Sequence, residues 1–133
     1  MGEMVKYRHW IESIIDRLVK NKKPPFIIAA AITTSGPPHL GTVCEFLYPW
    51  AIVEELKSKG YDVYFVFIGD IMDAFDNIPA TLRKYENVLR PHLGKPLVDV
   101  PDPYGCHDSY GEHFLDDTKK LMYKLNVYPD EVI

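Results

Sequence analysis

Residues 26–41 read FIIAAAITTSGPPHLG, and this stretch decides how the rest of the chain is interpreted. Phe26 to Ile32 is an unbroken apolar run without polar alternation, a pattern typical of a strand buried on both faces of a parallel sheet. The residues that follow, 33–41, contain two glycines and two prolines. The stretch therefore predicts a buried strand that ends in a tight loop.

A helix and a second strand follow this loop. The helix is expected from about Gly41 to Lys59, where Gly60 suits a helix C-cap, and the strand from Tyr61 to Ile68. Pro49 is expected to kink the helix or to break it near Tyr48. Residues 26–68 thus spell a βαβ unit, which predicts an α/β fold with a parallel sheet and a right-handed crossover.

Further elements are expected on both sides of this unit. Residues 5–22 and 107–126 carry apolar side chains at helical spacing. The proline-rich segment 78–105 is expected to hold a short helix around 81–89, and 127–133 reads as the approach to a third strand. So small a sheet leaves unpaired edges, so we expect a partner, either a second copy or further chain.

Composition bounds the class of protein. At 133 residues the chain, 1–133, is interpreted as one partial domain. A net charge of −4 and a pI near 5.7 argue against a surface that grips nucleic acid. Cys44 and Cys106 fit a reducing cytoplasm, with a bridge between them as the alternative. Neither a membrane span nor a secretory signal is recognised, so we expect a cytoplasmic protein without membrane contact.

The loop after the first strand is a candidate phosphate site. Ligands of parallel sheets bind at the carboxyl ends of the strands, here residues 33–41 and 69–75. Backbone N–H groups and the dipole of the following helix would attract a phosphate, and His39 could donate to it. The alternative is that the loop only turns the chain and that His39 is an ordinary surface residue.

An acidic pair follows the second strand. Asp70 and Asp73 are three residues apart, so in a helical turn both carboxylates would face one side and could hold an ammonium group. The alternative is that they only cap a helix.

The segment GCHDSYGEHF, residues 105–114, mixes acids, hydroxyls and imidazoles at a loop-to-helix junction. This mixture suits the wall of a polar pocket, although Asp108 or Ser109 could simply cap the helix. A zinc site from Cys106, His107 and His113 is the alternative. We disfavour it because the two histidines, six residues apart, share a helix face poorly and because no CxxC pair is present, so no metal is expected.

Three stretches resemble class I lysyl-tRNA synthetases of the archaeal type. Pro38-His39-Leu40-Gly41 is similar to the HIGH signature of class I synthetases and related nucleotidylyl transferases, and residues 31–41 resemble the corresponding lysyl-enzyme run. Asp70, Asp73 and Phe75 match the family's acidic motif. Residues 95–114 carry the most specific similarity.

The resemblance implies a Rossmann-like (HUP-type) partial nucleotide-binding fold that activates lysine with ATP and Mg²⁺ before tRNA charging. Catalytic roles fall to His39 and Thr42. The implied ATP contacts are Thr33, Ser35, Gly36, Pro38, His39 and Gly41. The implied amino-acid contacts are Thr33, Asp70, Asp73, His107, Tyr110, Glu112 and His113.

The chain departs from the family at four positions. Thr42 and Cys44 replace the family's histidine or asparagine and its arginine, and Gly69 and Ile71 replace a tryptophan and an aspartate. The family's remaining strands, KMSKS loop and anticodon-binding region are not recognised. We therefore expect an incomplete enzyme, a homo-oligomer or partner of a complementary chain, which meets tRNA only through that chain or missing regions. The alternatives are a non-catalytic paralogue that binds an amino acid, adenylate or protein, and a small nucleotidylyl transferase.

Overall fold

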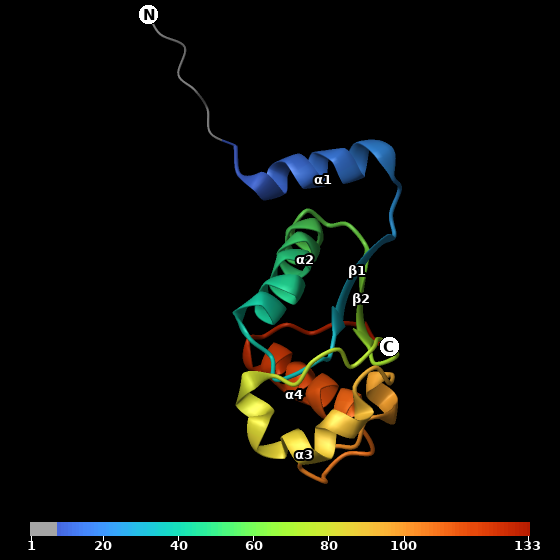
Figure 1. Ribbon diagram of the computed structural model, residues 1–133. Coiled ribbons are helices and arrows are strands. Elements are labelled where there is room, and N and C mark those ends of the chain that lie inside the picture. The colour runs from blue at the N-terminus through green and yellow to red at the C-terminus, as the bar shows by residue number, and fades with distance from the viewer. Residues whose placement is uncertain (1–7) are drawn as a thin grey trace, which may run out of the picture.

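A parallel three-stranded sheet forms the centre of the protein in the computed structural model, which describes residues 8–133 (Figure 1). The strands are β1 (Phe26–Thr33), β2 (Val63–Asp70) and the short β3 (Glu131–Val132), in the order β1-β2-β3. β1 and β2 pair along their whole length, from Phe26 with Val63 to Thr33 with Asp70. The predicted α/β fold with a parallel sheet is confirmed, and the loops after β1 and β2 leave the sheet side by side.

Three longer helices accompany the sheet: α1 (Trp10–Asn21), α2 (Leu40–Ser58) and α4 (Tyr110–Lys124). α2 continues through Pro49, so the predicted break near Tyr48 is wrong. The predicted helix over 5–22 is confirmed from Trp10 onward, and its residues 5–7 lie outside the described part of the chain.

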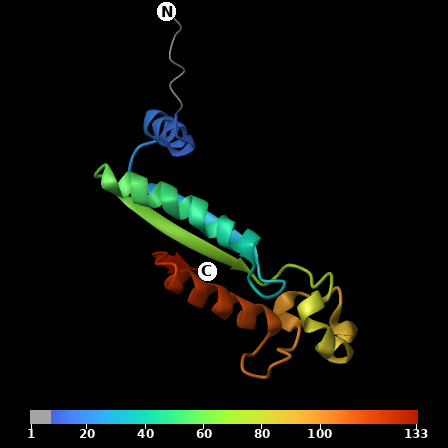
Figure 2. The same cartoon turned by 90° about the vertical axis from the view of Figure 1, so that its left-hand side faces the viewer.

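The segment between β2 and α4 is built from single turns. It holds the four-residue α3 (Glu86–Leu89) and the 3₁₀ turns Ala80–Tyr85, Arg90–His92 and Leu97–Asp99. The helix expected around 81–89 is thus mostly 3₁₀. A small separate core of Phe75, Leu82, Leu89, Leu97, Val100, Tyr110 and Phe114 holds the segment together. This segment and α1 lie at opposite ends of the sheet (Figure 2).

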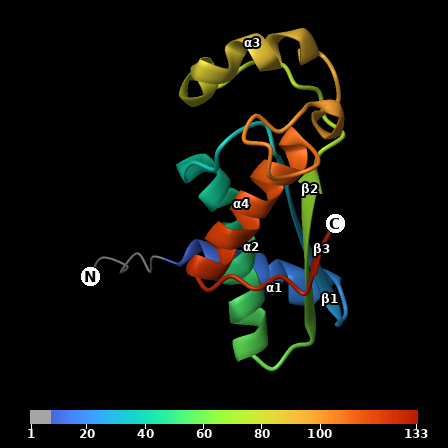
Figure 3. The same ribbon diagram turned by 90° about the horizontal axis from the view of Figure 1, so that it is seen from below.

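One face of the sheet carries the main core. Phe26 and Ala30 of β1 and Phe65 and Phe67 of β2 pack with Phe46 of α2 in a cluster that also includes residues of α1 and α4. Figure 3 shows α2 and α4 on the same side of the strands. Because the chain steps in one direction from β1 to β2 to β3, two crossovers of the same hand place both connecting helices on the same face.

The opposite face of the sheet is open in residues 8–133. Ile27 is 71% exposed and Tyr64 is 42% exposed, and burial alternates along β1 and β2. The prediction that the first strand is buried on both faces is therefore wrong, because residues 8–133 cover only one face of β1. Its apolar run has the composition of a doubly covered strand, but both crossovers in the described residues pass over the same face. None of the helices in residues 8–133 is long and apolar enough to span a membrane.

Candidate functional site

A cavity of about 430 Å³ opens at the carboxyl end of β1, where the sequence predicts the phosphate site. Its walls come from the loop after β1 and from the segment after β2: Thr33, Ser35, Gly36, Pro37, Pro38, His39, Thr42, Asn77, Pro79, Ala80 and Thr81. The cavity brings together every predicted ATP contact except Gly41, which lies next to it at the start of α2. Sequence reasoning missed Asn77, Pro79 and Thr81, because only the tertiary fold brings that segment to the loop.

His39 is the N-cap of α2, and its imidazole has a defined orientation. Its Nδ1 accepts a hydrogen bond from the Gly41 N–H at 3.0 Å, and the Thr42 hydroxyl oxygen accepts from the His39 N–H at 3.2 Å. An acceptor Nδ1 in the neutral ring leaves the proton on Nε2. His39 can therefore donate from Nε2 to an anion while it caps the helix. Thr42, a departure from the family's signature, completes this cap.

Two glycines allow the close approaches in this loop. A Cβ at Gly41 would lie 2.7 Å from His39 Cε1, and a Cβ at Gly36 would lie 2.9 Å from Pro79 Cγ. Such contacts are too short for carbon atoms, so the imidazole and the Pro79 ring occupy the space that side chains would fill.

The acidic pair lies in a turn after β2, without a helix. The Asp70 Oδ1 accepts from the N–H groups of Met72 and Asp73, each at 3.1 Å, so this carboxylate stabilises a turn, and the alternative that the pair caps a helix is wrong. The Asp73 Oδ2 accepts from the Thr33 hydroxyl at 2.9 Å. Both side chains are exposed, and Thr33 connects Asp73 to the cavity. Their amino-acid-binding role remains a prediction.

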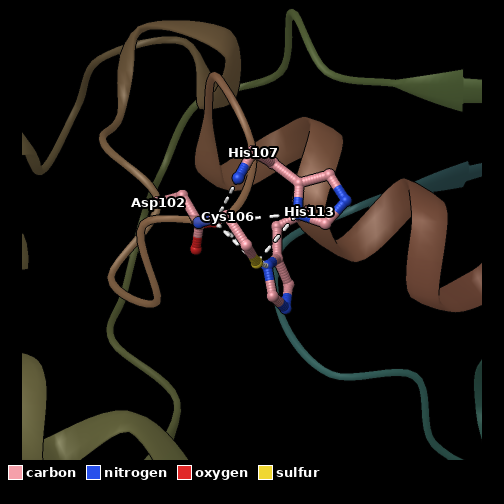
Figure 4. Close-up of side chains that lie close together, drawn as sticks. All are labelled: Asp102, Cys106, His107 and His113. Atoms are coloured by element: carbon pink, nitrogen blue, oxygen red, sulfur yellow. Dashed lines mark hydrogen bonds and ion pairs between the residues drawn. The ribbon is translucent and has the colours of Figure 1, made fainter.

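A second group of polar side chains converges before α4: Asp102, Cys106, His107 and His113 (Figure 4). One donor atom from each residue lies within 4.8 Å of the others. The Cys106 Sγ lies 3.1 Å from His107 Nδ1 and 3.3 Å from His113 Nδ1. We call these four residues the donor cluster.

Asp102 anchors the donor cluster. Its side chain is 1% exposed and accepts from the N–H groups of Tyr104, Cys106 and His107 at 2.9–3.0 Å. Burial alone would raise the pKa of this carboxyl, but the hydrogen bonds to its charged form outweigh burial and lower the pKa to about 2. Asp102 is therefore a carboxylate at neutral pH. Burial and the neighbouring Asp102 raise the pKa of the Cys106 thiol.

Both imidazoles of the donor cluster are oriented in the way that metal-bound histidines usually are. Each directs Nδ1 toward Asp102 and Cys106, while His107 Nε2 lies 3.1 Å from Asp116 and His113 Nε2 lies 3.4 Å from Asp117. Carboxylates that accept from the outer nitrogen of a histidine orient it for a metal. One thiol, two imidazoles and one carboxylate fit the tetrahedral donor set of zinc.

The argument against a zinc site that was based on the spacing of the two histidines is therefore wrong. His107 precedes α4 and His113 lies inside it, so the two rings converge without sharing a helix face. Sequence reasoning also missed Asp102. A D-x-x-x-C-H spacing ahead of His113 was the available signal.

The two remaining candidates of the 105–114 segment have structural partners. Tyr110 is fully buried, and its hydroxyl donates to the Ser35 carbonyl oxygen at 2.7 Å. The Ser109 hydroxyl caps α4 by accepting from the Glu112 N–H at 3.2 Å and lies 3.3 Å from the Glu112 carboxylate. The capping alternative is confirmed for Ser109. Tyr110, Glu112 and the two histidines are not among the residues that line the cavity.

The other departures from the family also have packing partners. A Cβ at Gly69 would lie 2.4 Å from Leu115 Cδ1, so glycine lets α4 pack closely on β2. A Cβ at Gly111 would lie 3.0 Å from the Ile71 Cβ, so this pair packs face to face. Cys44 and Cys106 are free thiols, and the alternative of a bridge between them is not realised.

Comparison with known proteins identifies the family of the chain. The family described as tRNA synthetases class I (K) matches residues 8–133. The lysine–tRNA ligase of Pyrococcus horikoshii is 32% identical over 124 residues, which cover 92% of this chain and 23% of that protein. The lysine–tRNA ligase of Methanocaldococcus jannaschii is 36% identical over 109 residues, 80% of this chain and 20% of the ligase.

The chain spans less than a quarter of the length of these relatives. The matched range, residues 8–133, spans the loop after β1 and the segment after β2. The chain therefore belongs to the class I (K) family of tRNA synthetases.

Proposed function

We propose that this chain forms the ATP- and amino-acid-binding part of a lysine-activating enzyme. In the reaction, a carboxylate oxygen of lysine attacks the α-phosphorus of ATP, the bond to the bridging oxygen breaks, and pyrophosphate leaves. The products are lysyl-adenylate and pyrophosphate. Transfer to tRNA would require parts of an enzyme beyond residues 8–133.

The orientation of His39 is the observation that carries this proposal. The Gly41 N–H occupies Nδ1, so Nε2–H is free to donate at the wall of the cavity. The N-terminus of α2 opens beside it, and its dipole favours negative charge. A phosphate at this point would meet a directed donor and the positive end of a helix, and both strengthen as charge grows in the transition state.

The charges of the residues that line the cavity indicate which further cationic groups the reaction requires. Among the described residues that line the cavity, none is a lysine or an arginine. A triphosphate would therefore keep most of its charge, so we expect Mg²⁺ to accompany ATP and cationic side chains to come from outside residues 8–133. This is the physical reason to expect that the chain does not complete the reaction alone.

The ATP site is tested by titration calorimetry of the full-length protein with a non-hydrolysable ATP analogue and Mg²⁺. We expect His39→Ala to weaken binding by about 10- to 100-fold, the range of one hydrogen bond to a charged group. His39→Asn is the matched control, because asparagine also caps helices but lacks the imidazole donor. Unchanged affinity in both variants would remove His39 from the phosphate site.

The amino-acid site is tested with a non-hydrolysable lysyl-adenylate analogue, with the arginyl analogue as control. We expect the lysyl compound to bind more tightly and Asp73→Asn to reduce the difference, because an amide cannot pair with an ammonium group. Asp99→Asn, an exposed change outside the cavity, should leave both affinities unchanged. Equal binding of the two compounds by the unaltered protein would contradict lysine selectivity and would favour the non-catalytic alternative.

We also propose that the donor cluster holds one zinc ion with a structural role. Four protein donors leave no open position, which is typical of structural zinc and not of catalytic zinc. The expected result is one zinc per chain by elemental analysis, lost in His113→Ala and retained in the control His92→Ala. Metal-free protein after purification with added zinc would contradict this proposal.

A further inference from the structure

We propose that Tyr110 is a positioning residue that couples the donor cluster to the nucleotide-binding loop. The inference deepens the proposed function, since the loop that it concerns is the proposed ATP site. It also goes beyond that function, because it makes the affinity for nucleotide depend on the occupancy of a site that the nucleotide does not touch.

The coupling begins at a single long-range hydrogen bond. The Tyr110 hydroxyl donates to the Ser35 carbonyl oxygen at 2.7 Å, between residues 75 positions apart. The Tyr110 ring is fully buried between Phe75 and Phe114, with ring centroids 4.9 Å and 4.7 Å away. This packing gives the hydroxyl one direction. Burial raises the pKa of the phenol, so the group remains a donor at neutral pH.

The loop has few other ties to the protein. Within the described chain, residues 35–38 take part in no backbone–backbone hydrogen bond of the turns and loops. Gly36 lies between two side chains: a Cβ there would be 2.9 Å from Pro79 Cγ and 3.7 Å from the Tyr110 hydroxyl oxygen. The hydrogen bond from the Tyr110 hydroxyl therefore fixes the position of the Ser35–Gly36 backbone at the cavity wall.

The other end of the coupling is the donor cluster. Tyr110 is the first residue of α4, and His113 follows it by three residues in the same turn. His113 Nδ1 lies 3.1 Å from Asp102, and the Tyr110 N–H donates to the Val100 carbonyl oxygen at 2.8 Å. Residues 100–113 thus form a closed loop around the cluster, and the first turn of α4 is part of that loop.

A metal in the donor cluster would hold this first turn in place. Zinc bound by His113 and by Asp102, Cys106 and His107 restrains the start of α4 against the preceding loop. The restrained turn fixes the Tyr110 hydroxyl, and the hydroxyl fixes the Ser35 carbonyl. A nucleotide then binds a loop that is already ordered and loses less conformational entropy. Linkage requires that nucleotide tighten zinc by the same factor.

Hydrogen exchange followed by mass spectrometry tests this coupling on the full-length protein without nucleotide. We compare the zinc-loaded protein with the protein in EDTA and follow peptides that cover 33–42 and α4. In the unaltered protein, zinc should slow exchange of both regions, the loop by about fivefold, the factor of one ordinary hydrogen bond. In Tyr110→Phe the loop should exchange rapidly with or without zinc, while α4 keeps its response.

Tyr128→Phe is the matched control. Its hydroxyl also donates to a single acceptor, the Asn126 side chain at 3.0 Å, but this acceptor is only two residues away and the side chain is half exposed. It should behave like the unaltered protein. Equal zinc protection of the loop in Tyr110→Phe would overturn the proposal. So would zinc protection of α4 without protection of the loop in the unaltered protein, or no response to zinc in either region.

A calorimetric titration with the ATP analogue separates this inference from the proposed function. We expect zinc to tighten binding by about fivefold in the unaltered protein and to have no effect on Tyr110→Phe. If the unaltered protein binds no ATP analogue, the proposed function fails, and the exchange experiment still decides whether Tyr110 transmits the state of the cluster. If it binds equally well with and without zinc, the coupling fails and the ATP site stands.

Discussion

The proposed nucleotide-binding loop, residues 33–41, and the donor cluster are both polar sites at the same end of the sheet, but they are built in different ways. The loop is partly exposed, and its end is held by neighbours in sequence: His39 caps α2, and Thr42 accepts from the His39 N–H. Tyr110 reaches its Ser35 carbonyl from far along the chain. The donor cluster surrounds the buried carboxylate of Asp102. It closes only when the loop before α4 folds back on the helix.

Local contacts fix the start of α2, whereas non-local contacts form the donor cluster. Capping contacts join residues two or three positions apart, so their residue types can be recognised in the sequence. A cluster that depends on backbone curvature around one carboxylate has no such periodicity. It also tolerates less change, because a buried charge that loses its partners keeps the full cost of desolvation.

The largest expected effect tests the tolerance of the donor cluster. Asp102→Asn leaves only one oxygen that can accept, so an NH2 group would face either the Tyr104 N–H, which now donates to Oδ1, or the Cys106 and His107 N–H groups, which now donate to Oδ2. We expect the free energy of unfolding to fall by on the order of 3 kcal/mol in EDTA, where no metal contributes. Urea denaturation measures this loss, with the exposed Asp108→Asn as control. A loss below 1 kcal/mol would mean that the backbone of this loop does not depend on the carboxylate.

A smaller effect is expected in the nucleotide-binding loop. Gly41→Ala places a methyl group where the His39 ring lies and displaces the imidazole from its cap. We expect ATP-analogue affinity to fall about tenfold and the unfolding free energy to fall by about 1 kcal/mol, the worth of one cap. The neighbouring Leu40→Ala, on a side chain that is 79% exposed, should change neither. Equal affinities in both variants would contradict the orientation assigned to His39.

A substitution at Thr34, between the loop and the core, should raise the stability of the protein instead of lowering it. Thr34 is 2% exposed, and its hydroxyl is the buried side-chain group without a hydrogen-bond partner in the described chain. Thr34→Val replaces it with a methyl group of similar size. We expect thermal denaturation to show a gain of about 1 kcal/mol in stability. A loss would show that the hydroxyl has a partner, such as a buried water, when the protein is in solution.

The smallest effect concerns the two faces of the sheet. In protein limited to this chain, Ile27→Lys on the open face should change the unfolding free energy by less than about 0.5 kcal/mol. Ile28→Thr, on the adjacent residue that packs against the main core, should cost about 1–2 kcal/mol. A loss of more than 1 kcal/mol for Ile27→Lys would show that another segment or a second copy covers the open face.

The β1–α2–β2 unit, the location of the candidate site after β1 and the family could all be predicted from the sequence. Apolar runs and the positions of glycine and proline act within a few residues, so the strands and the helix between them could be recognised. The capping role of His39 was not predicted, because histidine is not among the usual N-cap residues. The sequence similarity over residues 95–114 indicated the family but not the roles of these side chains. The helix expected from about Gly41 to Lys59 is observed at nearly that length, and only the alternative of a break near Tyr48 was wrong, because a helix whose face is packed can tolerate the lost hydrogen bond.

Three features could be seen only in the tertiary structure. They are the covered face of the sheet, the residues that line the cavity, and the contacts of residues 105–114. Coverage depends on the direction of successive crossovers, which no single strand records. Asn77 and Thr81 reach the cavity through the separate core under their segment. Tyr110 meets Ser35, and Asp102 gathers Cys106 and two histidines, because the chain folds back on itself, and such contacts follow from packing rather than from spacing.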